Sequence, residues 1–129
     1  MLLLFQLLVS CDPGDGRLTL VNNSKDTVYY TISYNDSITT FPLVTSDNKI
    51  KYESSNIIEP MNNYHYGIIG DWEHVINTSK DSTITIFFFN KDLIVLAKED
   101  SILRNQLFSK KVKLKVSDLE KSGWKVVFP

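Results

Sequence analysis

The sequence predicts an α+β fold that is mainly β: a single domain arranged as an antiparallel sheet or as a β-sandwich-like structure. Two observations favour this class. Several segments alternate apolar and polar residues with a period of two and are rich in β-branched and aromatic side chains, as half-buried strands are. The segments with a helical pattern are short, number two or three, and fall in the second half of the chain.

Composition and charge narrow the class of protein. The 129 residues suffice for one domain with one hydrophobic core. The 14 basic residues balance 15 acidic ones, which argues against nucleic acid as a partner, because nucleic-acid-binding proteins carry a strongly basic face. Cys11 is the only cysteine, so an intramolecular disulfide and a zinc site built from several cysteines are excluded.

The first half of the chain contains the clearest period-two pattern. Residues 17–22 predict a first strand, and residues 27–34 predict a second in which Tyr29 falls on the polar face. Turn-forming residues 23–26 separate the two strands, so we expect an antiparallel hairpin.

The middle of the chain is less regular. We expect a short edge strand over residues 38–44, because Pro42 interrupts it, and then a polar loop over residues 46–56. Residues 57–58 form a short apolar piece, and residues 64–70 predict another short strand.

The strongest apolar run lies after a brief helix. Asp71 predicts the N-cap of a helix over residues 72–77, since its carboxylate accepts from free amides of the first turn. Residues 83–89 become apolar on both faces, which predicts a central strand. Residues 92–97 fit either a helix or a strand.

The last part of the chain predicts two helical segments and two strands. Ser101 is the expected cap of a helix over residues 101–108 whose inward residues are Ile102, Leu103 and Leu107. Residues 111–116 alternate lysine with Val112, Leu114 and Val116, as in a strand. A capping box over residues 117–120 starts one helical turn, Gly123 ends it, and residues 124–128 form the last strand.

The N-terminal segment has a different character. Residues 1–9 are apolar apart from Gln6, which is too short a run to cross a bilayer but fits the core of a secretory signal. We therefore expect a signal peptide over residues 1–10 that is removed, a flexible tether over 11–16, and one globular β-rich domain over 17–129. The alternative is a buried N-terminal strand or helix with an ordinary core cysteine.

Residues 8–11, with the sequence Leu-Val-Ser-Cys, resemble the bacterial lipobox. This resemblance implies that Cys11 is acylated and becomes the first residue of the mature protein, which makes membrane lipid a partner. Two or more acyl chains hold a protein stably on a bilayer, because each buried CH₂ contributes about 0.8 kcal/mol.

The rest of the chain resembles a group of small lipoproteins from Bacteroidota. The matching pieces are the first hairpin (Asn22 to Ser24 and Thr27 to Tyr30), Trp72-Glu73, residues 86–89, Ile102-Leu103, residues 117–120 and Trp124-Lys125-Val126. The resemblance implies a lipid-anchored protein of a two-membrane cell envelope, with the outer membrane favoured over the inner. It brings no catalytic residues.

The same resemblance makes four tripeptides candidate sites of O-glycosylation, because Bacteroidota modify exported proteins at Asp-Ser or Asp-Thr followed by an apolar residue or threonine. The candidate residues are Thr27, Ser37, Ser82 and Ser101. The alternative is that these residues are only turn and cap residues at the starts of elements.

Signals for chemistry are weak. Asp71, Glu73, His74 and His65 are the only cluster with metal-binding or acid–base side chains, and their spacing matches no zinc motif such as H-E-x-x-H. We expect no metal, no cofactor and no catalytic residue, and keep a small hydrolase that uses His65 and His74 as the least favoured alternative.

Two groups of residues are candidate ligand contacts. Lys111, Lys113 and Lys115 share one face, where they contact anionic headgroups or acidic glycans, or else protect an edge strand from pairing with a neighbour. Tyr29, with Tyr64 and Tyr66, is a candidate platform for sugar or peptide. We therefore expect a non-enzymatic envelope lipoprotein that binds or scaffolds, with a glycan- or peptide-binding accessory of a surface uptake system as the alternative.

Overall fold

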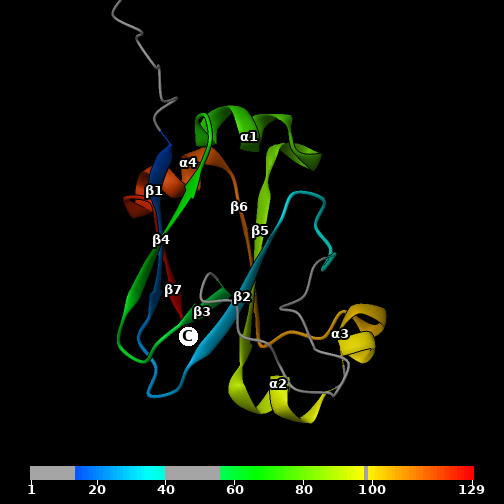
Figure 1. Cartoon of the computed structure of the whole chain (residues 1–129). Helices are drawn as coiled ribbons and strands as arrows, with labels where there is room; N and C mark the ends of the chain where they lie inside the picture. Colours follow the sequence, from blue (N-terminus) through cyan, green and yellow to red (C-terminus); the bar gives the residue numbers. More distant parts are fainter. Residues whose placement is uncertain (1–13, 40–55, 98) are drawn as a thin grey trace, which may run out of the picture.

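A computed structural model describes residues 14–39, 56–97 and 99–129 of the chain. It contains two β-sheets and several short helices, and it confirms the predicted α+β, mainly β class (Figure 1). The three-stranded sheet has the order β4-β1-β7 and consists of β1 (Asp15–Asn22), β4 (Asn63–Ile68) and β7 (Lys125–Phe128). The four-stranded sheet has the order β3-β2-β5-β6 and consists of β2 (Val28–Ser33), β3 (Ile57–Ile58), β5 (Ile84–Asn90) and β6 (Lys110–Leu114).

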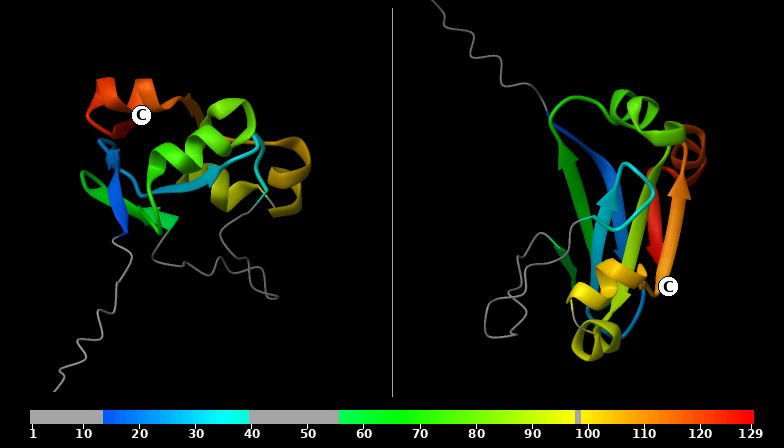
Figure 2. Two further views of the ribbon diagram at one scale, coloured as in Figure 1. Left: turned by 90° about the horizontal axis from the view of Figure 1, so that it is seen from above. Right: turned by 90° about the vertical axis from the view of Figure 1, so that its right-hand side faces the viewer.

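The helices gather at the two ends of the strands. They are α1 (Trp72–Thr78), the 3₁₀ turn η2 (Lys80–Ser82), α2 (Lys91–Leu96), α3 (Glu99–Asn105) and α4 (Val116–Ser122). In Figure 2, α1 and α4 lie at the end where β1 begins, while α2 and α3 lie toward the opposite end. Within the described ranges, none of the helices has the length and apolar character needed to cross a bilayer.

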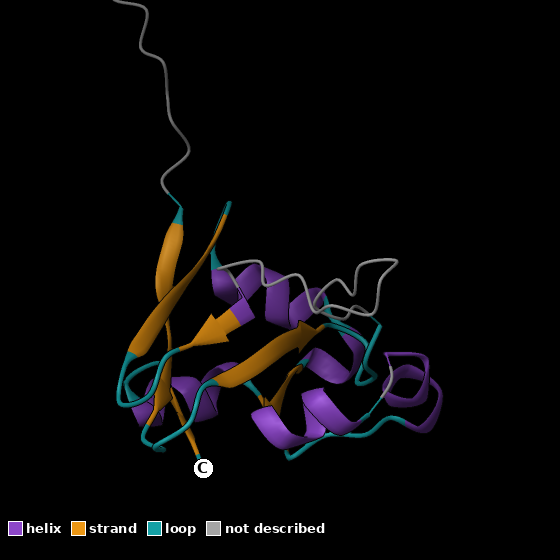
Figure 3. Ribbon diagram, turned by 60° about the horizontal axis from the view of Figure 1, so that its bottom comes forward, coloured by secondary structure: helices purple, strands orange, loops and turns teal. Residues whose placement is uncertain are grey.

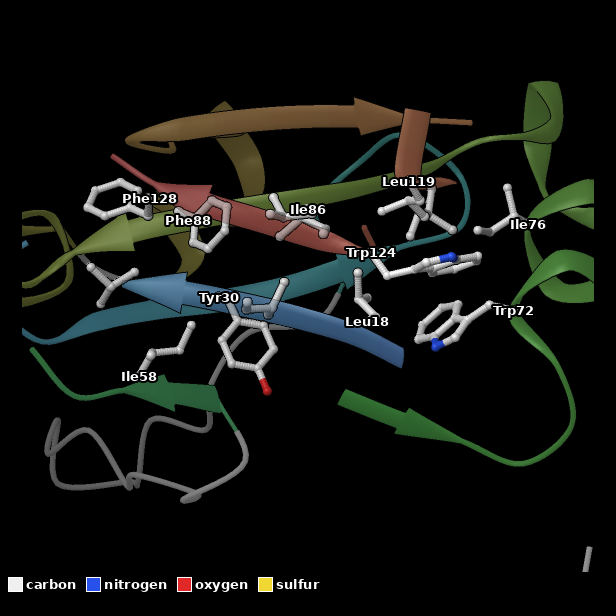
Figure 4. Packing of buried hydrophobic residues seen from close by; sticks show 14 residues of the cluster. Leu18, Tyr30, Ile58, Trp72, Ile76, Ile86, Phe88, Leu119, Trp124 and Phe128 are labelled. Atoms are coloured by element: carbon white, nitrogen blue, oxygen red, sulfur yellow. The ribbon is translucent and has the colours of Figure 1, made fainter. Parts of the chain in front are cut away.

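The main core lies between the two sheets. Leu18 and Leu20 of β1 pack there against Tyr30 of β2 and Phe88 of β5, all without exposed surface, and Trp72 closes the layer at the α1 end (Figure 4). These side chains come from distant parts of the sequence. Burial of each large apolar side chain contributes about 1.5–3 kcal/mol, so this layer is the main source of stability.

A second core covers the outer face of the four-stranded sheet. Tyr29, Phe87 and Phe89 pack there with Ile94 of α2 and Ile102 of α3. Consequently β5 is buried on both faces, which confirms the predicted central strand. The same cover makes the half-buried prediction for residues 27–34 wrong: Tyr29 is only 3% exposed, although it lies on the polar face of the pattern.

The predicted hairpin of β1 and β2 is also wrong. The two strands belong to different sheets: β1 pairs antiparallel with β4 and parallel with β7, while β2 pairs antiparallel with β3 and β5. Asn22, fully buried, holds the corner between the sheets. Its side-chain amide donates to the carbonyls of Asp26 and Ile58 at 2.8 and 2.9 Å, and its Oδ1 accepts from the Ser24 amide.

Of the three predicted helix starts, one is confirmed and two are wrong. The Asp71 cap is confirmed, since its carboxylate accepts from the His74 amide at 2.8 Å. Asn90 caps α2 in the same way, so residues 92–97 are mainly helical rather than a strand. The predicted Ser101 cap is wrong because α3 begins at Glu99, two residues earlier.

The predicted capping box of Ser117 and Glu120 is wrong, because the N-cap of α4 is Lys115, whose side chain has no hydrogen-bond acceptor. Asp118, three residues after Lys115, accepts from the Lys115 backbone amide at 2.9 Å, so the helix starts at Val116. Gly123 ends the helix with a left-handed φ of 66°, as predicted. The last strand follows, with Trp124, Val126 and Phe128 buried on one side.

The remaining predictions concern residues at or beyond the edges of the described ranges. β1 begins at Asp15, so residues 15–16 belong to the strand and not to the predicted tether. Residues 38–39 are not in a strand, and the rest of the predicted edge strand and most of the polar loop, residues 40–55, lie outside the described residues. The predicted signal peptide and Cys11 also lie outside them.

Candidate functional site

A half-open hollow of about 330 Å³ lies where β2 begins and β5 ends, the end that Figure 3 turns toward the reader. Its lining residues are Thr27, Tyr29, Ile57, Glu59 and Lys91. Three elements bring them together. Tyr29 and Ile57 are partners in the β2–β3 pairing, and Glu59 follows β3 directly. Lys91 is the first residue of α2, where the capped turn after β5 fixes its backbone.

The hollow combines two opposite charges with a hydroxyl and an apolar wall. The Thr27 hydroxyl donates a long hydrogen bond of 3.4 Å to Glu59 Oε2. Lys91 makes no ion pair with any residue in the described part of the chain, and Glu59 makes none there either. Both residues are exposed, so the hollow presents one solvated carboxylate and one solvated ammonium group that pair with no charged residue in these ranges.

Tyr29, predicted as a ligand contact, lies in this hollow but does not form a platform. Because only 3% of its surface is exposed, the ring belongs to the wall and its face is covered by the second core. Sequence reasoning missed Glu59 and Lys91, since isolated charged residues after a short apolar piece and at a helix start have no distinctive pattern.

The other two tyrosines of the predicted platform face the main core. Tyr64 and Tyr66 pack with Tyr30, with ring centroids 6.0 to 6.5 Å apart and ring planes inclined by 36° to 81°. Tyr66 also contacts Trp72. Rings inclined in this way fill a core and do not offer a flat stacking surface.

The predicted row of lysines, which consists of Lys111, Lys113 and Lys115, lies partly on the edge strand β6. Lys111 and Lys113 pair with Asp36 at 3.1 and 3.4 Å, and the hydrogen bond from Lys111 is the main cause that lowers the pKa of Asp36. Lys115 is the N-cap of α4 rather than a strand residue. Since β6 is an edge strand of the four-stranded sheet, the row occupies the position at which lysines protect an edge.

The histidines and carboxylates do not come together. His65 is exposed on β4, where Nδ1 lies 2.9 Å from the Thr19 hydroxyl, while Asp71 is engaged as a helix cap. Glu73 pairs with Arg17 instead of with His74. Among the described residues, no group of three histidine, cysteine or acidic side chains is placed to hold a metal ion.

A charged cluster that the sequence analysis did not predict lies at the start of β1. Arg17 pairs with Asp15 at 2.7 Å and with Glu73, and its guanidinium lies 4.1 Å from the ring centroid of Trp124. Asp15 also accepts from the Trp72 amide at 3.0 Å. The Arg17 hydrogen bond is the main cause that lowers the pKa of Asp15 to about 2 and also lowers that of Glu73. The cluster fastens the first strand to α1 and to the residue before β7.

The four candidate glycosylation residues differ in accessibility. Ser82 is exposed, whereas Thr27, Ser37 and Ser101 are half-buried. Two of the hydroxyls make local hydrogen bonds: Ser37 donates to Asn35 Oδ1 at 3.0 Å, and Ser82 donates to the Asn77 carbonyl at 3.3 Å. Thr27 lines the hollow, so a glycan there and a ligand in the hollow would compete for the same space.

Comparison of the chain with protein-family models, with curated proteins and with solved structures finds no match.

Proposed function

We propose that this protein is a lipoprotein of a bacterial cell envelope that is held on the membrane through acylated Cys11 and acts by binding rather than by catalysis. The binding site in this proposal is the hollow formed by Thr27, Tyr29, Ile57, Glu59 and Lys91. The host group is Bacteroidota and the membrane is the outer one, on the resemblance described above.

One observation carries the proposal: the start of the domain and the hollow lie at opposite ends of the strands. β1 begins at Asp15 beside α1 and runs eight residues to Asn22, beyond which the turn leads to Thr27 (Figure 1). At about 3.3 Å per residue, that strand separates the two ends by roughly 23 Å.

The distance from the anchor to the domain is short. Cys11 precedes Gly14, the first described residue, by three positions, and three residues span at most about 11 Å. A lipid on Cys11 therefore keeps the start of β1 near the bilayer, and the hollow lies at the other end of the strands. A site at that end is accessible to ligands from the aqueous side.

The anchor is tested with Cys11→Ser in the native host. The unchanged protein is expected in the membrane fraction, with a mass that corresponds to acylation and removal of residues 1–10, and the variant in another fraction or unprocessed. Intact-mass measurement of the same sample tests the glycans, because each adds mass to peptide plus lipid. Unchanged protein that is water-soluble and retains residues 1–10 would refute the anchor.

The binding role is tested separately by filling the hollow with Thr27→Trp. A bulky ring at its rim is expected to abolish capture of ligand from an envelope extract while leaving membrane association and thermal unfolding unchanged. Unchanged capture would refute the hollow as the site. The hydrolase alternative predicts instead a turnover that is lost in a His74→Ala variant.

A further inference from the structure

We infer that the hollow binds a small zwitterion, either a free amino acid or a short peptide with unblocked ends. The inference deepens the proposed function and rests on it, because it names the ligand class of the same site. It is based on the two opposite charges at the hollow, on the size of the hollow and on the burial of its aromatic residue.

The charges give the first reason. Glu59 and Lys91 line one hollow, yet neither forms an ion pair within the described ranges. Their backbones are held by different elements, Glu59 after β3 and Lys91 at the start of α2. An ammonium group on a ligand complements Glu59, and a carboxylate complements Lys91, so a molecule with both groups satisfies both residues at once.

The hydrogen-bonding capacity of the Glu59 carboxylate also favours an ammonium group on the ligand. Its Oε2 accepts the Thr27 hydroxyl at 3.4 Å, which leaves Oε1 and further lone pairs of the carboxylate for an ammonium donor.

Size and burial give the second reason. A volume of about 330 Å³ is near the lower limit of small-molecule sites, which fits an amino acid or dipeptide and is too small to enclose a long oligosaccharide. Ile57 and Tyr29, which both line the hollow, supply apolar contact for a side chain or a peptide stem. Sugar recognition by stacking needs an exposed aromatic face, and Tyr29, at 3% exposure, does not provide one.

The test is isothermal titration calorimetry on the full chain in a non-ionic detergent at low ionic strength. The probes are L-leucine, the dipeptide L-alanyl-L-leucine, the N-acetylated dipeptide, the dipeptide amide, and maltose as a neutral sugar. The variants are Lys91→Gln and Glu59→Gln. Lys121→Gln and Glu120→Gln on α4, both exposed and at the opposite end, are the matched controls.

The expected result is that of a double-mutant cycle, in which a charge is removed from the ligand, from the protein, or from both. Blocking either end of the bound zwitterion weakens binding by up to about fivefold, as expected for an exposed charge pair. Lys91→Gln weakens the zwitterion similarly and removes the effect of blocking the carboxylate, while Glu59→Gln removes the effect of blocking the amine. The α4 control variants change neither the affinity for the zwitterion nor the effect of blocking either of its ends. L-leucine and the dipeptide together show whether a single amino acid suffices.

Several outcomes would overturn the inference. Maltose binding in place of the zwitterions, equal binding of blocked and free dipeptides, or no binding of either zwitterion at millimolar concentration would each do so. Thermal unfolding of every variant is measured in parallel, so that a lost fold is recognised, and Lys91→Arg, which keeps the charge, is expected to retain binding. Membrane association in the Cys11→Ser test is independent of these results, so failure here leaves the proposed anchor intact.

Discussion

Replacing Asp15 by asparagine tests the cluster that fastens β1 to α1. The substitution keeps the size of the side chain and one carbonyl oxygen but removes the negative charge. In the structure the carboxylate accepts from Arg17 at 2.7 Å and from the Trp72 amide at 3.0 Å. Asparagine can keep one of these bonds, so the expected loss is mainly electrostatic.

The magnitude follows from the pKa of Asp15. The Arg17 hydrogen bond is the main cause that lowers it from 3.8 to about 2. At 1.36 kcal/mol per pKa unit, this corresponds to at most about 2.4 kcal/mol. The Arg17 side chain is 44% exposed, so solvent screens part of the interaction. We expect Asp15→Asn to lower the free energy of unfolding by about 1–2 kcal/mol at pH 7.

The pH dependence has a defined sign. Because the pKa of Asp15 is lower in the folded state, its contribution is complete above about pH 4 and is lost as the pH falls toward 2. The pKa values of Glu73 and Asp36 are also lowered, so the unchanged protein loses further stability over the acidic range. The difference between the protein and the variant should therefore shrink with decreasing pH.

The assay is urea unfolding followed by tryptophan fluorescence at pH 7, 4 and 2.5, with the full chain in a non-ionic detergent. Glu120→Gln, at an exposed position of α4, is the control and is expected to change little. An Asp15→Asn effect that is as large at pH 2.5 as at pH 7 would show that the carboxylate charge is not responsible. No effect at pH 7 would show that the cluster does not contribute to stability.

Three further substitutions test other parts of the fold. Phe88→Ala, in the fully buried core between the sheets, is expected to cost about 3–5 kcal/mol in urea unfolding; a loss below 1 kcal/mol would contradict the packing. Gly123→Ala, at a φ of 66°, should cost about 1 kcal/mol, whereas Gly67→Ala, where no atom obstructs a Cβ, should have a much smaller effect in the same assay. Replacing both Lys111 and Lys113 by valine should increase aggregation measured by light scattering, since β6 is an edge strand; a monomeric double variant would refute the protective role.

Local patterns were sufficient for most elements. Alternation over two residues predicted β2 and β7, the wholly apolar stretch predicted the central β5, and Asp71 and Gly123 marked a helix start and a helix end. Each of these signals depends on residues within a few positions of one another. The lipobox-like segment and the expectation of an anchored protein likewise came from adjacent residues alone.

Tertiary structure decided which strands pair and which sheet faces are buried. β1 takes β7 as a neighbour from the far end of the chain, and no local pattern encodes which distant strand fills that place. The polar face of β2 is buried because the chain returns after β5 and places α2 and α3 over it, so Tyr29 became a wall residue. The hollow has the same origin. Glu59 and Lys91 are far apart in sequence, and they line one hollow because β3 and β5 both pair with β2.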